Sequence, residues 1–458
     1  MKKIFEYAKK NILLILLVLQ PVLDIIAYFQ RDSAVSLAGY IRLAITLLVP
    51  AYVLFFARDR KKFIISMLII WGFGALHVLN GFRVGYISVV SDVKYFLLVV
   101  HALVLLFSFI FLYEKDEIIR QVVTALKIVV VLIVVPYYLS YFLKSGNHTY
   151  MHSLTGWTGW NNTQNSFSIC LSALFPFALY YCLSSKRRWM LIFLLPISYM
   201  YIMNGTKATY LTLVASLFGF IAFLTMEFFV QKKKSFPIIS IAVLIFLLGG
   251  SIFCYNYSPR QEIDTLDEIN IEETEKELEA DEEKTEDVFT SYLDKGMLKR
   301  FGKERYLSAY KGELTAENLA NVRLKKIIFG RLVWEKTDAL TKFVGYEQAL
   351  MLVDGETYDL ESDPQAIYFY YGYIGAFLYA ALLLYFFLRL IKQLICKFKD
   401  SFNLFNFTVF ISYMLLLGSA VYAGYLLRRP NSSIYLTIVL LLIYCRTEPL
   451  FKKSAKKD

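Results

Sequence analysis

The chain has 458 residues, of which 57% are hydrophobic and 17% aromatic, and its formal net charge at pH 7 is +11. The mean hydropathy of +0.50 is far above that of a soluble domain and is typical of membrane proteins with several spans. This composition excludes a water-soluble enzyme. Positive charge in the loops between spans sets the orientation of a membrane protein, so the basic balance needs no nucleic acid and we expect no nucleic-acid partner.

Long apolar runs recur along the whole chain. A helix needs about 20 mostly apolar residues to cross about 30 Å of hydrocarbon. About twelve runs approach this length, centred near residues 20, 47, 71, 103, 132, 173, 196, 219, 246, 378, 413 and 438. The run near 196 is the weakest because it is short. We therefore predict an all-α polytopic membrane protein with about twelve transmembrane helices embedded in a lipid bilayer.

Dense basic clusters separate alternate runs. They comprise the lysines at 2, 3, 9 and 10 and the clusters at 58–62, 185–188, 231–234, 389–399 and 451–458. The positive-inside rule places every cluster on the cytoplasmic side. We therefore expect a bacterial plasma-membrane protein whose N- and C-termini are both cytoplasmic.

The same alternation places one large polar segment, residues 256–365, outside the cell. It divides a transmembrane domain of nine helices (1–255) from one of three helices with a basic tail (366–458). Within the segment, residues 256–288 are acidic and without aromatic clusters, as in a solvated helix or a disordered spacer. Residues 289–365 mix cations with aromatics and are predicted to fold against the membrane face.

Charged residues inside or beside the apolar runs are the informative ones. Asp24 and Arg42 lie at apolar depth, where a structural ion pair is one interpretation. Lys207 stands in NGTKATYL (204–211), between two threonines at a predicted helix start. Helix N-termini and hydroxyls favour anions, so this lysine predicts an anion site for a phosphate or pyrophosphate group. Further cations are predicted near the external surface, where they either contribute to a phosphate or pyrophosphate site or extend to lipid headgroups. They are Arg31, Arg83, Lys94, Arg428 and Arg429.

Two further segments predicted to be external carry suitable side chains. The aromatic rings and amides of GWTGWNNTQNS (156–166) can stack on sugar rings and hydrogen-bond to sugar hydroxyls. The alternative interpretation is an aromatic belt at the membrane interface. The candidate glycan-binding residues are Trp157, Trp160, Asn161 and Asn162. Glu361 and Asp363 precede the tenth run, and one of them is predicted to act as a general base on a sugar hydroxyl. Asp363, just before Pro364, also suits a helix N-cap.

His148 and His152 have the i, i+4 spacing of metal ligands, but no third ligand is near them in sequence. We predict no metal site and no cofactor.

The ordered blocks QPVLDIIAYF, GWTGWNNTQNSFSICLSALFPFALY, NGTKATYLTL, FGKERYLSAY, KKIIFGR and LESDPQAIYFYYGYIGAFLY resemble the O-antigen ligase and polysaccharide polymerase family in its Gram-positive branch. The resemblance covers most of the chain except the acidic run. It implies a GT-C type membrane glycosyltransferase. Such an enzyme takes glycan from a polyprenyl (undecaprenyl) pyrophosphate donor and passes it to an acceptor glycan or glycolipid, without metal and with inversion.

The resemblance also implies roles for particular residues. Glu361 and Asp363 match the positions where this branch of the family tends to show Glu-x-Asp and where ligases of Gram-negative bacteria tend to show histidine. Pyrophosphate contacts fall to Lys207, Lys303, Arg305 and Arg331. Lys303 stands where arginine is usual and so lacks a bidentate fork. Tyr425 replaces a common histidine.

Two interpretations from other classes stay open. A lipid-linked oligosaccharide flippase would also have about twelve spans and a cationic cavity, although no internal repeat is evident in this chain. A scaffold of a polysaccharide-assembly complex would account for the acidic segment but not for the ordered charged blocks. Assembly proteins are further candidate partners.

Overall fold

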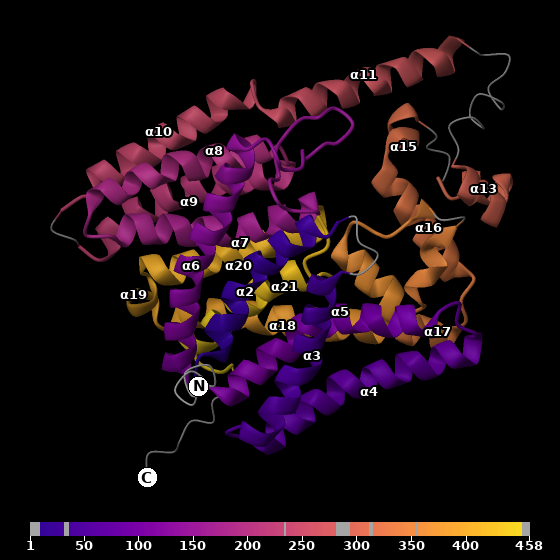
Figure 1. Ribbon diagram of the computed structural model, residues 1–458, viewed down its shortest axis with the longest axis horizontal. Coiled ribbons are helices and arrows are strands. Elements are labelled where there is room, and N and C mark those ends of the chain that lie inside the picture. The colour runs from indigo at the N-terminus through magenta and orange to yellow at the C-terminus, as the bar shows by residue number, and fades with distance from the viewer. Residues whose placement is uncertain are drawn as a thin grey trace. The chain divides into compact units, whose positions relative to one another are not determined.

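The computed structural model describes residues 10–31, 36–232, 235–280, 294–310, 315–353 and 356–450. Within these ranges, ten helices are long and apolar enough to cross a membrane, so the protein is an all-α, multi-pass membrane protein. They are α2 (Ile12–Phe29), α3 (Leu37–Phe56), α4 (Arg60–Val84), α5 (Val89–Leu112), α6 (Lys115–Phe142), α7 (Gln164–Ser184), α9 (Lys207–Val230), α10 (Ile238–Tyr255), α18 (Asp363–Cys396) and α20 (Leu404–Tyr422) (Figure 1).

The remaining two predicted runs also form helices, but shorter ones. The run near 196 is a 3-10 helix, η1 (Arg188–Phe193), followed by α8 (Leu194–Asn204), and the run near 438 is α21 (Pro430–Arg446). The count of twelve spans therefore stays a prediction. The first nine residues and residues 451–458 lie outside the described ranges, so the predicted side of the termini stays a prediction too.

Short elements occupy most of the segment predicted to be external. They are α11 (Pro259–Ala280), α13 (Lys295–Phe301), α14 (Lys303–Ser308), α15 (Ala316–Ala320), α16 (Val322–Glu335), α17 (Ala339–Val344), η2 (Gln348–Met351) and the antiparallel strands β1 (Leu352–Val353) and β2 (Glu356–Thr357). The short α19 (Phe398–Ser401) precedes α20. Most of the acidic run is helical in α11, while residues 281–288 lie outside the described ranges. The predicted domain boundaries concern sides of the membrane and stay predictions.

The chain divides into two compact units. The larger one combines the segment up to Leu68 with Leu97–Arg260 and the chain from Ala381 onward. The smaller one combines Ile69–Phe96 with Gln261–Ala380. Each unit therefore joins segments that are far apart in the sequence.

Helix α7 lies at the centre of the larger unit and packs against α9, α20 and α21. It is mostly apolar and is buried along most of its length, as expected for a helix without a solvent face. Its Ser168 and Ser172 hydroxyls each lie 2.8 Å from a threonine hydroxyl of the α9 segment, Thr206 and Thr212. Small hydroxyl residues thus allow close helix packing here and satisfy one another's hydrogen bonds.

The predicted pair of Asp24 and Arg42 is confirmed in the larger unit. Arg42 Nη2 lies 2.7 Å from Asp24 Oδ1, and its Nε donates to Gln20 Oε1 at 3.2 Å. Both charged side chains are largely buried, at 15% and 9% exposure for Asp24 and Arg42. The pair joins α2 to α3.

Replacing Arg42 with alanine is expected to destabilise the protein by about 3–5 kcal/mol, because Asp24 is left as an uncompensated buried charge. The measurement is the melting temperature and the monodisperse yield in detergent. The matched control is Arg58→Ala, which breaks an exposed pair with Glu114 and is expected to cost about 0–1 kcal/mol. The double change Asp24→Asn with Arg42→Gln should recover part of the loss; a double variant as unstable as the single variant would contradict this account.

Candidate functional site

Lys207 is the first residue of α9 and is exposed, so the predicted helix start is confirmed. The turn before it is tightly fixed. Gly205 adopts φ +73°, and Thr206 caps α9 by accepting a hydrogen bond from the Thr209 backbone at 3.3 Å. The Asn204 side-chain oxygen accepts from the hydroxyls of Thr206 and Thr209 at 3.1 and 3.2 Å. The lysine therefore projects from a rigid helix N-terminus, where the helix dipole favours an anion.

The loop that contains GWTGWNN packs against this turn, also within the larger unit. The Trp157 backbone N–H donates to the Met203 carbonyl at 2.8 Å, and the Thr149 hydroxyl donates to the Asn204 carbonyl at 2.5 Å. The structure thus brings together two segments that are 40 residues or more apart in the sequence, NGTKATYL and GWTGWNN.

The four side chains predicted to bind glycan differ in exposure. Trp157 is buried, and its indole N–H donates to Ser140 Oγ at 3.1 Å. Trp160 and Asn161 are half-buried, and Asn162 is exposed with its amide bonded to the Ala27 carbonyl at 2.7 Å. Stacking on an indole requires an accessible ring face. Trp160 is therefore better placed than Trp157 for the predicted sugar contact, which stays a prediction.

Glu361 lies between two cations of α16 in the smaller unit. Its Oε1 accepts from Lys326 Nζ at 2.8 Å and its Oε2 from Arg323 Nε at 2.9 Å, and the side chain is 21% exposed. Burial by itself would raise the pKa of Glu361, but the hydrogen bonds and charges of Lys326 and Arg323 outweigh burial and lower the pKa below its usual value. Glu361 is therefore a carboxylate at neutral pH.

Asp363 has a different environment. It is the first residue of α18 and therefore lies in the first turn, one residue later than the N-cap position considered above. Its side chain is fully buried. The Ala366 N–H donates to the Ser362 carbonyl at 3.0 Å, which closes that turn. Of the two predicted carboxylates, only Glu361 has exposed surface.

Arg305 and Arg331 share the carboxylate of Glu335. Arg305 Nη2 lies 3.4 Å from Glu335 Oε2, and Arg331 Nε lies 3.8 Å from Oε1. Arg331 also donates to the Ala309 carbonyl. Lys303 begins α14, two residues before Arg305, and is half-exposed. Two cations thus face one carboxylate here, and the predicted anion site stays a prediction.

Sequence reasoning missed several partners in the smaller unit. Arg323 and Lys326 were not singled out, although their i, i+3 spacing places both on one helix face. It also missed His77, whose Nδ1 lies 2.8 Å from the Val344 carbonyl and whose Nε2 lies 2.9 Å from Asp92 Oδ2. The sequence feature that could have indicated this contact is the presence of two ionisable residues, His77 and Asp92, within neighbouring apolar runs.

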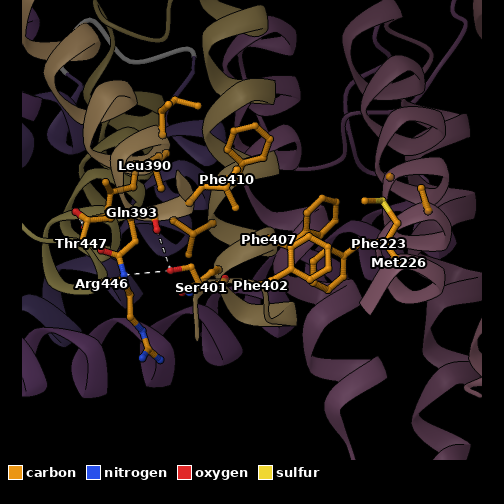
Figure 2. A pocket seen from close by; sticks show the side chains of 17 residues that line it. Phe223, Met226, Leu390, Gln393, Ser401, Phe402, Phe407, Phe410, Arg446 and Thr447 are labelled. Carbon is orange, nitrogen blue, oxygen red and sulfur yellow. Dashed lines mark hydrogen bonds between the residues drawn. The ribbon is translucent and has the colours of Figure 1, made fainter. Parts of the chain in front are cut away.

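An apolar pocket of about 340 Å³ lies in the larger unit, between α9, the end of α18, α20 and the end of α21. The rings of Phe223, Phe402 and Phe407 pack together on one side of the pocket, and on the other side Gln393 is hydrogen-bonded to Ser401 (Figure 2). Such a lining suits a hydrocarbon chain and offers little to sugar hydroxyls. We assign no part of the glycan chemistry to it.

Comparison with known proteins defines the family. No curated protein and no solved structure matches the chain. A family model described as "O-antigen ligase like membrane protein" matches residues 6–448, nearly the entire chain. Together with the ten apolar helices, this match establishes that the chain belongs to the family of O-antigen ligase-like membrane proteins.

Proposed function

We propose that the protein is a bacterial cell-surface polysaccharide polymerase or ligase. It transfers glycan from a polyprenyl (undecaprenyl) pyrophosphate donor to an acceptor glycan or glycolipid on the extracytoplasmic face of the plasma membrane. Within a family of O-antigen ligase-like proteins, one observation carries this proposal further: the ionised, partly exposed Glu361 between Arg323 and Lys326. Its oxygens can accept a hydrogen bond from an acceptor hydroxyl.

The cations supply the second half of the proposed chemistry. As the bond between the anomeric carbon and the pyrophosphate breaks, negative charge grows on the leaving group. Fixed cations lower the barrier most where charge develops in the transition state. We assign this role to Lys207, Lys303, Arg305 and Arg331. Because these residues provide the positive charge, the proposed reaction requires no metal ion.

The acceptor hydroxyl attacks the anomeric carbon from the face opposite the pyrophosphate, so the anomeric configuration inverts. Its proton passes to Glu361 as the new glycosidic bond forms, and then to solvent. The polyprenyl pyrophosphate departs with the electron pair of the broken bond. A carboxylate of lowered pKa is a weak base, which suffices because pyrophosphate is already a good leaving group.

Lys207→Ala is expected to lower glycan transfer by about 10²-fold, the loss typical of one electrostatic group removed from a transition state. In cells, single repeat units should accumulate on the lipid carrier at the outer leaflet, and the surface glycan should shorten. The measurement is the glycan length distribution together with the leaflet of the lipid-linked units.

The matched control is Lys186→Ala, an exposed lysine of the predicted cytoplasmic cluster, which should leave the glycan unchanged. Variant protein must be present in the membrane at wild-type levels. Units trapped on the cytoplasmic leaflet would contradict the proposal and favour the flippase.

A further inference from the structure

The smaller unit contains a polar pocket that none of the residues with a predicted catalytic, pyrophosphate-binding or glycan-binding role lines. Its volume is about 430 Å³, within the range of small-molecule sites. It lies between the end of α4, the turn that follows it and the segment Lys336–Leu350. Its lining includes Asn80, Arg83, Tyr86, Lys336, Asp338 and Glu347.

The base of this pocket is held by buried polar contacts. Both oxygens of Glu347 accept backbone N–H groups, from Ile87 at 2.5 Å and Ser88 at 3.1 Å. His77 bridges Asp92 and the Val344 carbonyl, and the Tyr86 hydroxyl lies 3.1 Å from Asp92 Oδ2. These contacts tie the α4–α5 turn to the segment after α17. Because these contacts already order the site, ligand binding requires little loss of conformational entropy.

At the rim of the pocket, Arg83 is held in place by hydrogen bonds to Asp338 and Asn80. Arg83 Nη1 lies 2.6 Å from Asp338 Oδ2, and Arg83 Nη2 donates to Asn80 Oδ1 at 2.8 Å. The Asn80 amide donates to Thr341 Oγ1 at 3.1 Å. The hydrogen bond from Arg83 and those from Thr341 hold the pKa of Asp338 well below its usual value, so this carboxylate stays ionised. Oδ1 of Asp338 is occupied by Arg83 Nη2 and by the Thr341 backbone N–H, both at 2.9 Å, whereas Oδ2 accepts from Arg83 Nη1, which leaves one lone pair on Oδ2 for a ligand hydroxyl.

The charges of the lining decide between ligand classes. Arg83 and Lys336 are balanced by Asp338 and Glu347. A pyrophosphate entering the pocket would meet two carboxylates, whereas a neutral polyol meets donors and acceptors together. Adjacent sugar hydroxyls can accept from a cation and donate to a carboxylate at once, and Tyr86 adds ring surface for the apolar face of the sugar.

We propose that this pocket binds a neutral sugar residue of the glycan substrate. The assignment rests on the proposed function in that a glycan is the substrate, but sugar binding itself does not require transfer. The donors and acceptors of the pocket can bind a sugar residue of either the acceptor glycan or the donor glycan.

The test is direct binding to the purified full-length protein in nanodiscs, without donor. The probe is the set of neutral oligosaccharides obtained by hydrolysing the host's surface polysaccharide. Arg83→Lys keeps the charge and loses the fork, and Asp338→Asn keeps the helix cap and loses the charge. Each is expected to raise Kd by about tenfold, the effect of losing one hydrogen bond to a charged group.

Lys342→Ala, in α17 and outside the lining, is the control and should bind like the wild type. If either rim variant fails to fold, Lys336→Ala replaces it, because Lys336 lines the pocket at an exposed position. This variant too is expected to raise Kd. Wild-type Kd in folded rim variants, or displacement of the oligosaccharide by inorganic pyrophosphate, would overturn the proposal.

Steady-state transfer assays then identify the source of the sugar. A higher KM for the acceptor with unchanged kcat assigns the pocket to the acceptor glycan, and a higher KM for the donor assigns it to the donor glycan. If the wild type binds oligosaccharide but transfers nothing, the proposed function fails while the sugar site stands.

Discussion

Replacing Glu361 with glutamine is expected to reduce glycan transfer by about 10²-fold, the lower end of the contribution of a general base. The amide keeps the size of the side chain but cannot take up the acceptor proton, and it loses the charge-assisted hydrogen bonds to Lys326 and Arg323. The rate is measured in proteoliposomes with lipid-linked donor and acceptor glycan. Glu268→Gln, an exposed change on α11, is the control and should retain the wild-type rate. Full activity in folded Glu361→Gln would remove this residue from the mechanism.

The pH dependence gives an independent test of the same carboxylate. Because Lys326 and Arg323 lower the pKa of Glu361 below 4.5, the active carboxylate form persists through the neutral range. The rate should therefore fall only as the pH drops through that lowered pKa. Lys326→Gln removes one of the two cations and leaves burial less opposed, so the acid limb should move to higher pH. An acid limb that does not move would assign it to another group.

The helices and one ion pair could be predicted from the sequence because both depend on local or strongly constrained chemistry. Apolar runs of spanning length have few alternatives to helix in a membrane. Asp24 and Arg42 could be paired because an unpaired charge at apolar depth is costly. The predicted start of α9 at Lys207 rested on its flanking threonines, which are good caps.

The neighbours of the site residues could not be predicted, because hydropathy encodes depth in the membrane and not lateral position. Glu361 meets Arg323 across 38 residues and Lys326 across 35. The segment Ile69–Phe96 joins Gln261–Ala380 in one compact unit, although residues 97–260 separate them in the sequence. The Trp157 backbone likewise donates to the Met203 carbonyl, a contact that no local pattern around the tryptophan reveals.

Gly372 is the position where a single methyl group is expected to do the most structural damage. Helix α18 is interrupted there, with φ +63° and ψ −166°, a conformation that only glycine adopts readily. Backbone breaks inside a membrane-spanning helix require other partners for the exposed peptide groups. One is supplied by α17 and its continuation, because the Tyr346 N–H donates to the Phe369 carbonyl at 3.3 Å.

Gly372→Ala is expected to reduce the yield of folded protein severely, and to reduce glycan transfer with it. A Cβ at this position would lie 2.5 Å from the Phe343 carbonyl carbon and 2.6 Å from the Lys342 carbonyl oxygen, which are backbone atoms that cannot rotate away. Backbone strain costs about 1–3 kcal/mol, and overpacking adds about 1–3 kcal/mol. Gly345 closes the other side of the same contact, so Gly345→Ala should behave similarly.

The matched control is Gly72→Ala in α4, where a Cβ would have no atom within 4 Å and the backbone is helical. This change should leave the melting temperature unchanged or raise it, since alanine favours the helix by about 0.5–1 kcal/mol over glycine. The measurement is the melting temperature and the monodisperse fraction after extraction. Equal behaviour of Gly372→Ala and Gly72→Ala would show that the break in α18 is not required. Glu361 lies two residues before α18 begins at Asp363, and the break lies nine residues beyond Asp363. Loss of the break should therefore displace the proposed catalytic carboxylate from Arg323 and Lys326.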